Sequence, residues 1–385
     1  MDFIKRHRTL APTFLAAVIL LVLIFLPTGF EGALTYQNAD RVKARVLSTD
    51  ESDIVDTGLI RTGEQRCTVL ILGGMFEGQE TQAVNRLNGS LSQDKIFAPG
   101  DTAFIAVSHS GGEITAATMV DHYRLDKEGV LALIFLLLLV VFAGKTGLRA
   151  ILSFAVTLLT MWKVLVPCLL KGYDPVAAAF LSVIFMNLVS LSLIYGWDRR
   201  CLASAMGAGL GIGVTALLGY VFTDALMIHG AVMESSESLL YVGLSNIDLT
   251  RIFIASVFIG SSGAIMDLSV DICSAVYEVT QKRPDISQKE AIFSGFAVGR
   301  AACGSTTTTL LLAYSGSYIA LLMVFMAQGT PVDHILNYKY VAAEILDTLV
   351  GSFGLVTVAP FTAITASLLY TRRRGVRACR EAAQG

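Results

Sequence analysis

The sequence predicts an α-helical protein that crosses a membrane about eight times and carries one small β domain outside the bilayer. Hydrophobic residues make up 54% of its 385 residues and charged residues only 16%, against roughly a quarter in an average soluble domain. The charges are concentrated in one segment, because residues 28–128 hold 9 Lys and Arg and 15 Asp and Glu. The near-equal acidic and basic totals argue against a nucleic-acid partner, and the apolar content excludes a disordered chain.

Four regions follow from this distribution of charge. They are an N-terminal cytoplasmic tip and transmembrane anchor (1–27), an extracytoplasmic β domain (28–128), a seven-helix membrane domain (129–371) and a basic cytoplasmic tail (372–385). The basic start and apolar centre of the first region are also typical of a signal peptide. No small-x-small cleavage site follows at residues 28–30, so we expect the anchor to be retained.

Eight stretches are candidate spans, since a spanning helix needs about 20 mostly apolar residues. They are residues 10–27, 130–143, 148–170, 175–196, 202–222, 252–272, 306–326 and 341–370. An even number of spans puts both termini on the same side, and Lys and Arg gather in every second loop, as the positive-inside rule requires of cytoplasmic segments. We therefore expect a protein embedded in the lipid bilayer, with both termini in the cytoplasm and residues 28–128 outside.

The segment 28–128 has the pattern of β-strands. Val42, Ala44 and Val46 alternate with basic residues, and turn signals such as Asn88-Gly89 separate further apolar stretches. About five short strands in this length fit a small barrel, with an OB-like barrel as one candidate. The six cysteines are scattered without a CxxC pair, so neither a disulfide framework nor a zinc site is expected, and Cys67 is interpreted as a small buried residue.

The sixth predicted span carries a polar stripe. Asp267, Asp271, Ser274 and Glu278 recur at the spacing that places them on one helix face. Ionisable groups at membrane depth are costly and are functional candidates by default. Two carboxylates one turn apart do not both ionise easily without a cation nearby, so the stripe suits the handling of a proton or a cation. The alternative is that the stripe is the solvated cytoplasmic end of the span.

The start of the seventh span adds a candidate counter-charge and several hydroxyl groups. Arg300 lies at its mouth and is either the partner of the aspartates on the sixth span or an anchor that snorkels to the headgroups. Gly304, Ser305 and Thr309 begin the span itself. The hydroxyls of Ser305 and Thr309 can line an ion path, or they can bond back to the carbonyls of their own helix.

Interruptions of the apolar pattern occur in two spans. Gly and Ser residues break the sixth span at 260–263 and the seventh at 315–317. Paired interruptions can mark discontinuous helices, whose free ends bind ions and substrates, or close packing between helices. In the fifth span, packing is the better explanation for the alternating glycines between 207 and 213.

Two further acidic residues lie near the outer end of the eighth span. Glu344 and Asp347 are three residues apart on one helix face, and we include both among the candidate ion-binding or substrate-binding residues. Lys163 lies deep in the third span and either snorkels outward or pairs with Asp347. Motifs of soluble enzymes fail, because the P-loop-like run at 144–146 lacks its first glycine and no HExxH or GxSxG occurs. No catalytic residue, metal or cofactor is expected.

Several short motifs lie along the membrane part of the chain. They are Gly263-Ala264-x-x-Asp267 with Asp271 and Glu278, Gly299-Arg300 with Gly304, residues 310–316, residues 350–354, and Pro360-x-Thr362. In these motifs the chain resembles the YibE/F-like family of bacterial multi-pass membrane proteins. Where the family pattern has an Asp and an Asn, this chain has Ala301 and Thr308. The resemblance implies a protein of the bacterial plasma membrane.

Three functions remain open from the sequence. The first is a secondary transporter or ion-conducting protein that uses the intramembrane carboxylates, with a proton or cation as partner. The second is a membrane component that does not transport but binds a protein or envelope partner through its β domain. The third, an intramembrane aspartyl protease using Asp174 and Asp267, has little support, because no GxGD motif precedes Asp267. The oligomeric state cannot be predicted.

Overall fold

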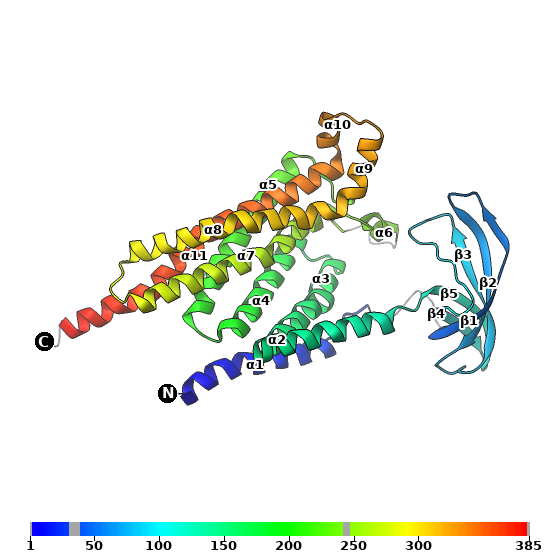
Figure 1. Ribbon diagram of the computed structural model, residues 1–385, viewed down its shortest axis with the longest axis horizontal. Coiled ribbons are helices and arrows are strands. Elements are labelled where there is room, and N and C mark those ends of the chain that lie inside the picture. Colours follow the sequence, from blue (N-terminus) through cyan, green and yellow to red (C-terminus); the bar gives the residue numbers. More distant parts are fainter. Residues whose placement is uncertain (1, 31–38, 242–246, 383–385) are drawn as a thin grey trace. The chain divides into compact units, whose positions relative to one another are not determined.

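The computed structural model describes residues 2–30, 39–241 and 247–382, and it divides into two compact units. The larger unit comprises Met1–Thr28 and Ala143–Gly385, and the smaller unit is Gly29–Phe142. Figure 1 shows the larger unit as a bundle of long helices and the smaller one as a barrel of strands with one helical extension.

Five strands form the smaller unit. They are β1 (Ala39–Asp56), β2 (Arg61–Ile71), β3 (Glu80–Asn88), β4 (Thr102–Ser110) and β5 (Glu113–His122). The strands close into a barrel in the order β1-β2-β3-β5-β4, and all neighbours are antiparallel except β3 and β5. The five-stranded barrel expected from the alternation of residues is confirmed. Its order and single parallel pair fit an OB-like barrel.

The interior of the barrel combines an apolar core with a small polar network. Cys67, Val69 and Ile105 are fully buried in the core, which confirms the interpretation of Cys67. Gln65 and Asn85 are also fully buried. Gln65 Nε2 donates to the Phe97 carbonyl at 2.8 Å, its Oε1 accepts from the Phe97 amide at 3.0 Å, and Asn85 Nδ2 donates to the same Oε1 at 3.2 Å. The network holds the segment before β4 to the barrel wall.

The helices of the chain follow the predicted spans closely. They are α1 (Asp2–Phe25), α2 (Leu125–Thr160), α3 (Val166–Leu170), α4 (Pro175–Tyr195), α5 (Arg199–Ala225), α6 (Ser236–Tyr241), α7 (Leu249–Lys282), α8 (Gln288–Ser315), α9 (Ile319–Ala327), α10 (Val332–Asn337) and α11 (Lys339–Ala382). A π-helical turn joins α2 to α3. Gly144 breaks α2 with a φ of 55° and a ψ of −126°, a backbone conformation that glycine adopts readily.

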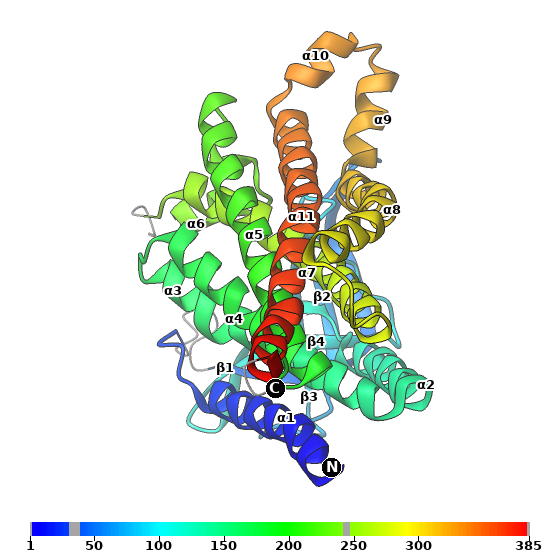
Figure 2. The same cartoon turned by 90° about the vertical axis from the view of Figure 1, so that its left-hand side faces the viewer.

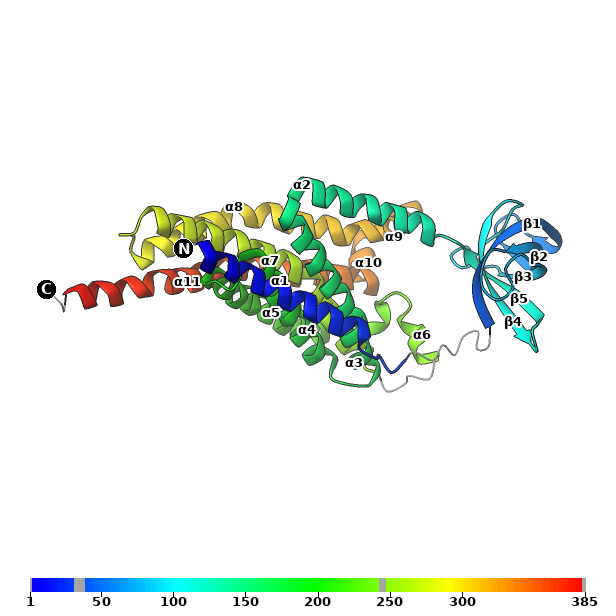
Figure 3. The ribbon, with the colours of Figure 1, turned by 90° about the horizontal axis from the view of Figure 1, so that it is seen from below.

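Five helical segments are long and apolar enough to cross a membrane within the described ranges, and six if α8 and α9 form one bent span. The run Leu125–Leu170, which contains the break at Gly144, is one of the five. The apolar part of α1, Ala11–Phe25, is shorter. It packs against α4 through Ala16, Leu23 and Val189, and Figure 3 shows α1 running alongside α4.

Small residues set the packing of the bundle core. In Figure 2, α11 lies between α5 and α8, and it also contacts α7. A Cβ added at Gly207 of α5 would lie 2.1 Å from the Thr362 hydroxyl of α11, and one at Gly211 would lie 2.9 Å from Val358. The predicted packing role of these two glycines is confirmed. Gly299 of α8 lies as tightly against Ala359 of α11, where an added Cβ would approach to 2.7 Å.

Candidate functional site

The seventh predicted span is a broken helix. α8 ends at Ser315, and α9 starts at Ile319 after a bend of 67°. The interruption expected at 315–317 is therefore a real discontinuity. The matching interruption at 260–263 is not, because α7 is one continuous helix from Leu249 to Lys282. The missing side chain of Gly260 instead allows Tyr314 of α8 to pack closely on α7, since a Cβ at residue 260 would lie 2.7 Å from the Tyr314 hydroxyl.

Glu344 and Asp347 of α11 lie against this break. Tyr318, which follows the bend, lines the same cavity as Glu344. Glu344 Oε1 and Asp347 Oδ1 are buried and have no hydrogen-bond partner among the described residues. A carboxylate oxygen buried without a partner is strongly disfavoured unless a proton or a cation compensates it. The break, the two carboxylates and Tyr318 together form the outer acidic site.

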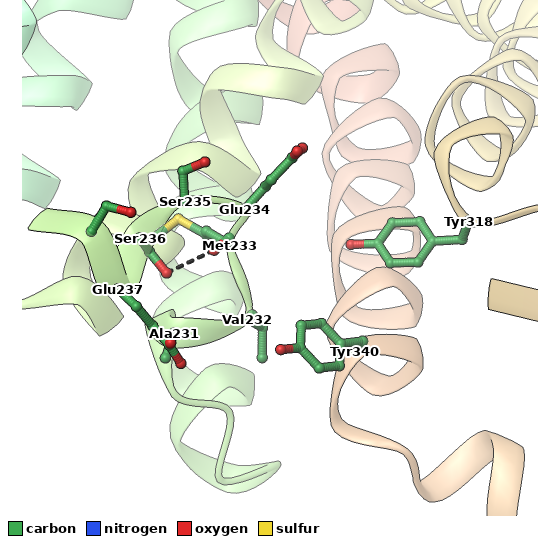
Figure 4. Close-up of a pocket in the computed structure, with 10 residues that line it drawn as sticks. Ala231, Val232, Met233, Glu234, Ser235, Ser236, Glu237, Tyr318 and Tyr340 are labelled. Atoms are coloured by element: carbon green, nitrogen blue, oxygen red, sulfur yellow. Dashed lines mark hydrogen bonds between the residues drawn. The ribbon is translucent and has the colours of Figure 1, made fainter. Parts of the chain in front are cut away.

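Two cavities adjoin the outer acidic site, and Tyr318 lines both. A cavity of about 260 Å³ includes Ser315, Glu344 and Thr348 in its wall. A cavity of about 570 Å³ lies between Tyr318, Tyr340 and the segment 231–238. Figure 4 shows the two tyrosines on one side of the larger cavity and the 231–238 segment on the other. Glu344 therefore borders open space in the smaller cavity, and Tyr318 separates it from the larger one.

The stripe on α7 has the predicted geometry. Asp267, Asp271, Ser274 and Glu278 are all exposed on the same helix face. Glu278 pairs with Lys282 at 2.6 Å, and the Ser274 hydroxyl lies 2.7 Å from the Tyr195 hydroxyl. Within the part of the chain that the structure describes, Asp267 and Asp271 make no hydrogen bond or ion pair. The end of the stripe near Lys282 thus has partners of its own, whereas Asp267 and Asp271 have none among the described residues.

The expected partner of these aspartates is not bound to them. Arg300 is exposed on α8 and forms no ion pair with any described residue, so the pairing with Asp267 or Asp271 is not observed. The hydroxyls of α8 bond to their own helix, because Thr309 Oγ1 donates to the Ser305 carbonyl at 3.0 Å and Thr308 Oγ1 to the Gly304 carbonyl at 3.0 Å. The local back-bonding alternative is therefore the observed one.

Two other predicted contacts take a different form. Lys163 Nζ donates to the Leu26 carbonyl beyond α1 at 3.2 Å, so of its two predicted alternatives the pairing with Asp347 is not observed. Asp174 caps α4 through the Ala177 amide at 2.8 Å and pairs with Arg251 in the first turn of α7. Arg251 is about 24 Å along α7 from Asp267, which separates the two aspartates of the protease hypothesis.

The outer acidic site and Asp267 lie at different levels of the bundle. Gly351 of α11 packs against Ser261 of α7, and Gly354 packs against Ile265, so the two helices run parallel. Asp347 is therefore level with residue 257 of α7. Asp267 lies ten residues further along the same helix, which corresponds to about 15 Å.

Sequence reasoning missed the aromatic and hydroxyl partners. Tyr318 follows the Gly-Ser interruption directly, and a polar aromatic beside a helix break is a signal that would have found it. A buried hydroxyl chain was also missed. Ser269 Oγ donates to the Ser204 carbonyl at 2.8 Å, and Thr362 Oγ1 donates to Ser269 Oγ at 3.1 Å. These three residues give no pattern in one helix, because they come from α5, α7 and α11.

The chain is thus a mostly helical protein with five or six segments apolar and long enough to span a membrane, two partly buried carboxylates on α11 and a small β barrel. Residues 131–372 match the family model described as YibE/F-like protein. The chain therefore belongs to the YibE/F-like family, and the resemblance drawn from its motifs is confirmed. The matched region begins after β5, so the barrel precedes it. Comparisons with curated proteins and with solved structures give no match.

Proposed function

We propose that this protein is a secondary transporter or ion-conducting protein of the bacterial plasma membrane, and that it moves a proton or a cation. In this proposal the chain crosses the bilayer eight times. Gly144 divides the run Leu125–Leu170 into two spans, α8 and α9 form one bent span, and α1 is a further span. Both termini are cytoplasmic and the barrel is outside, which the distribution of Lys and Arg supports.

The observation that carries the proposal is the outer acidic site. Glu344 Oε1 and Asp347 Oδ1 are buried beside a helix broken by 67°, and no described residue gives either oxygen a hydrogen bond. Discontinuous helices in transporters place free helix ends at ion and substrate sites. A pair of carboxylates held only for structure would be expected to find donors for these oxygens.

Asp267 supplies a second step for the same ion. It lies about 15 Å further towards the cytoplasmic end of α7 and has no partner among the described residues. An ion that leaves the outer acidic site therefore meets another carboxylate before it reaches the partnered end of the stripe, where Glu278 pairs with Lys282. The proposal assigns the outer site to binding and Asp267 to release.

Ion flux in proteoliposomes tests the proposal. Purified protein is reconstituted, a proton or sodium gradient is imposed, and flux is compared between wild type, Asp347→Asn, Glu344→Gln and Asp267→Asn. Asp285→Asn, an exposed carboxylate in the loop between α7 and α8, is the matched control. We expect the first three variants to lose flux and the control to keep it. Flux that survives in all three acidic-site variants would contradict the proposal.

A feature of the barrel favours a second candidate function, the binding of an envelope partner. Leu59 and Leu91 are 85% and 83% exposed, and both line a cavity of about 260 Å³ together with Arg61 and Asp94. Exposed apolar side chains beside a polar cavity are typical of a binding site. If binding is the function, the double variant Leu59→Ser, Leu91→Ser fails to rescue a deletion strain, while Asp347→Asn rescues it.

A further inference from the structure

The open face shared by α7 and α8 carries opposite charges that do not meet within one chain. The two helices are antiparallel neighbours (Figure 1), with Gly295 packed near Val276 and Gly299 near Ile272. This register places Arg300 of α8 level with Asp271 of α7. Both side chains are exposed, and neither forms an ion pair in the described structure. A charge of each sign thus lies at the same depth of the bundle without a partner.

Lipid is a poor cover for this face. Charged side chains that face hydrocarbon are strongly disfavoured, and those in membrane helices almost always face protein or water. The face cannot turn inward, because the opposite side of α7 is fixed in the core by Ile265, Leu268 and Ile272, which are at most 2% exposed. A partner that covers this surface must therefore supply a cation to Asp271 and an anion to Arg300.

We propose that this face is the interface between two copies of the chain, in which Arg300 of each copy pairs with Asp271 of the other. A two-fold axis along the membrane normal keeps every residue at its own depth, so level residues of the two copies meet. The charge pattern is self-complementary under that operation. Close approach is possible, because side chains added at Gly263 and Gly304 would meet no atom within 4 Å.

A purely apolar cover does not fit this face. A helix such as residues 130–143, which are apolar throughout, offers no cation to Asp271 and no anion to Arg300. A second copy offers both, and this charge complementarity is the reason for choosing it.

Charge exchange between separately tagged copies tests the interface. Arg300→Asp alone places two aspartates at each contact, and Asp271→Arg alone places two arginines there. When the two variants are mixed, both contacts regain one charge of each sign. We therefore expect that each full-length variant associates with itself roughly tenfold or more weakly than wild type. Co-expression of the two variants restores association to the wild-type level, which also shows that both fold.

The readout is co-purification of two tags from lipid nanodiscs or mild detergent, with the mass of the complex measured by light scattering. The matched control exchanges the exposed pair Arg283 and Asp285 of the α7–α8 loop, which lies 3.8 Å apart within one chain. The control variants are expected to associate as wild type does. The proposal would be overturned if wild type stays monomeric or if the single variants associate normally. It would also be overturned if only the double variant, with both substitutions in one chain, restores association. The readout does not require ion transport, so it fails or succeeds independently of the proposed function.

Discussion

At the scale of the residue, the site depends on two carboxylate oxygens, Asp347 Oδ1 and Glu344 Oε1, which are buried and have no hydrogen-bond donor among the described residues. Hydroxyl groups elsewhere in the bundle form regular bonds to helix carbonyls. Unsatisfied buried polar atoms are rare in native structures, and each one calls for an explanation. Binding a proton or a cation is the explanation adopted here.

Replacing Asp347 by asparagine is expected to separate stability from function. Asparagine has the shape of aspartate but carries no charge, so we expect the variant to be at least as stable as wild type. A gain in the free energy of unfolding would be about 1 kcal/mol or more. Transport should be lost. The measurement is the thermal unfolding midpoint in detergent, paired with the flux assay. A clear drop in the midpoint would show that Asp347 stabilises the fold, and would contradict a binding role.

Cys67 provides a second residue-scale prediction, in the barrel. Burial raises the pKa of its thiol to about 11. Because only the thiolate reacts, the native thiol at pH 8 should react at least a hundredfold more slowly than an exposed cysteine, and its rate should keep rising up to about pH 11. Peptide mapping after maleimide labelling measures this. Rapid native labelling at pH 8 would contradict the burial, and labelling in denaturant is the control.

At the scale of the element, the two Gly-Ser interruptions show what sequence can and cannot decide. Both consist only of Gly and Ser, but only 315–317 breaks its helix. In α7 the Ser261 hydroxyl donates to the Val257 carbonyl at 3.2 Å, and Gly351 of α11 packs against Ser261. Helix α7 is therefore supported here by its packing against α11, a contact that the local sequence of α7 does not reveal.

The depth of Arg300 was predictable, whereas its partner was not. Its place at the start of the seventh span put it near the aspartates of the sixth, and the register of α7 and α8 confirms that it is level with Asp271. Helical spacing also predicted the common face of the stripe. Spacing alone does not give the direction of a long side chain across a helix pair, so the sequence left open whether Arg300 pairs with an aspartate, and no such ion pair forms among the described residues.

The glycines of α5 give an element-scale prediction. Gly207→Val would place its Cβ only 2.1 Å from the Thr362 hydroxyl oxygen, which is far too close for two unbonded atoms. Such overpacking is expected to destabilise the bundle by about 1–3 kcal/mol. Gly213→Ala is the control, because a Cβ there meets nothing within 4 Å and alanine favours the helix by roughly 1 kcal/mol. Thermal midpoints of the two variants should move in opposite directions, and equal shifts would contradict the packing.

At the scale of the whole molecule, the chain combines a closed β barrel with a helical bundle whose α7–α8 face carries exposed polar side chains. The barrel has its own buried core, which includes Val69 and Ile105, and its strands were largely predictable from alternation and turn residues. The bundle was predictable as a set of apolar helices. Its hydroxyl chain and its tyrosines were not, because they depend on contacts between helices far apart in sequence.

The eight-span topology is testable with single cysteines. In that topology Lys171 lies in an outer loop and Lys145 in a cytoplasmic one, because Gly144 divides the run between two spans. We expect Lys171→Cys to react in intact cells with a reagent that does not cross the membrane, and Lys145→Cys to react only after permeabilisation. If the run crossed as one helix, the reagent would fail to reach Lys171→Cys from outside.

The central claim is that the outer acidic site binds the transported ion, and charge movement tests it most directly. Proteoliposomes on a solid-supported membrane are given a rapid jump in proton or sodium concentration, and the transient current is recorded. We expect a current in wild type and in Asp285→Asn, and none in the double variant Glu344→Gln, Asp347→Asn. A full-sized current in that double variant would show that the transported ion does not bind at the outer acidic site.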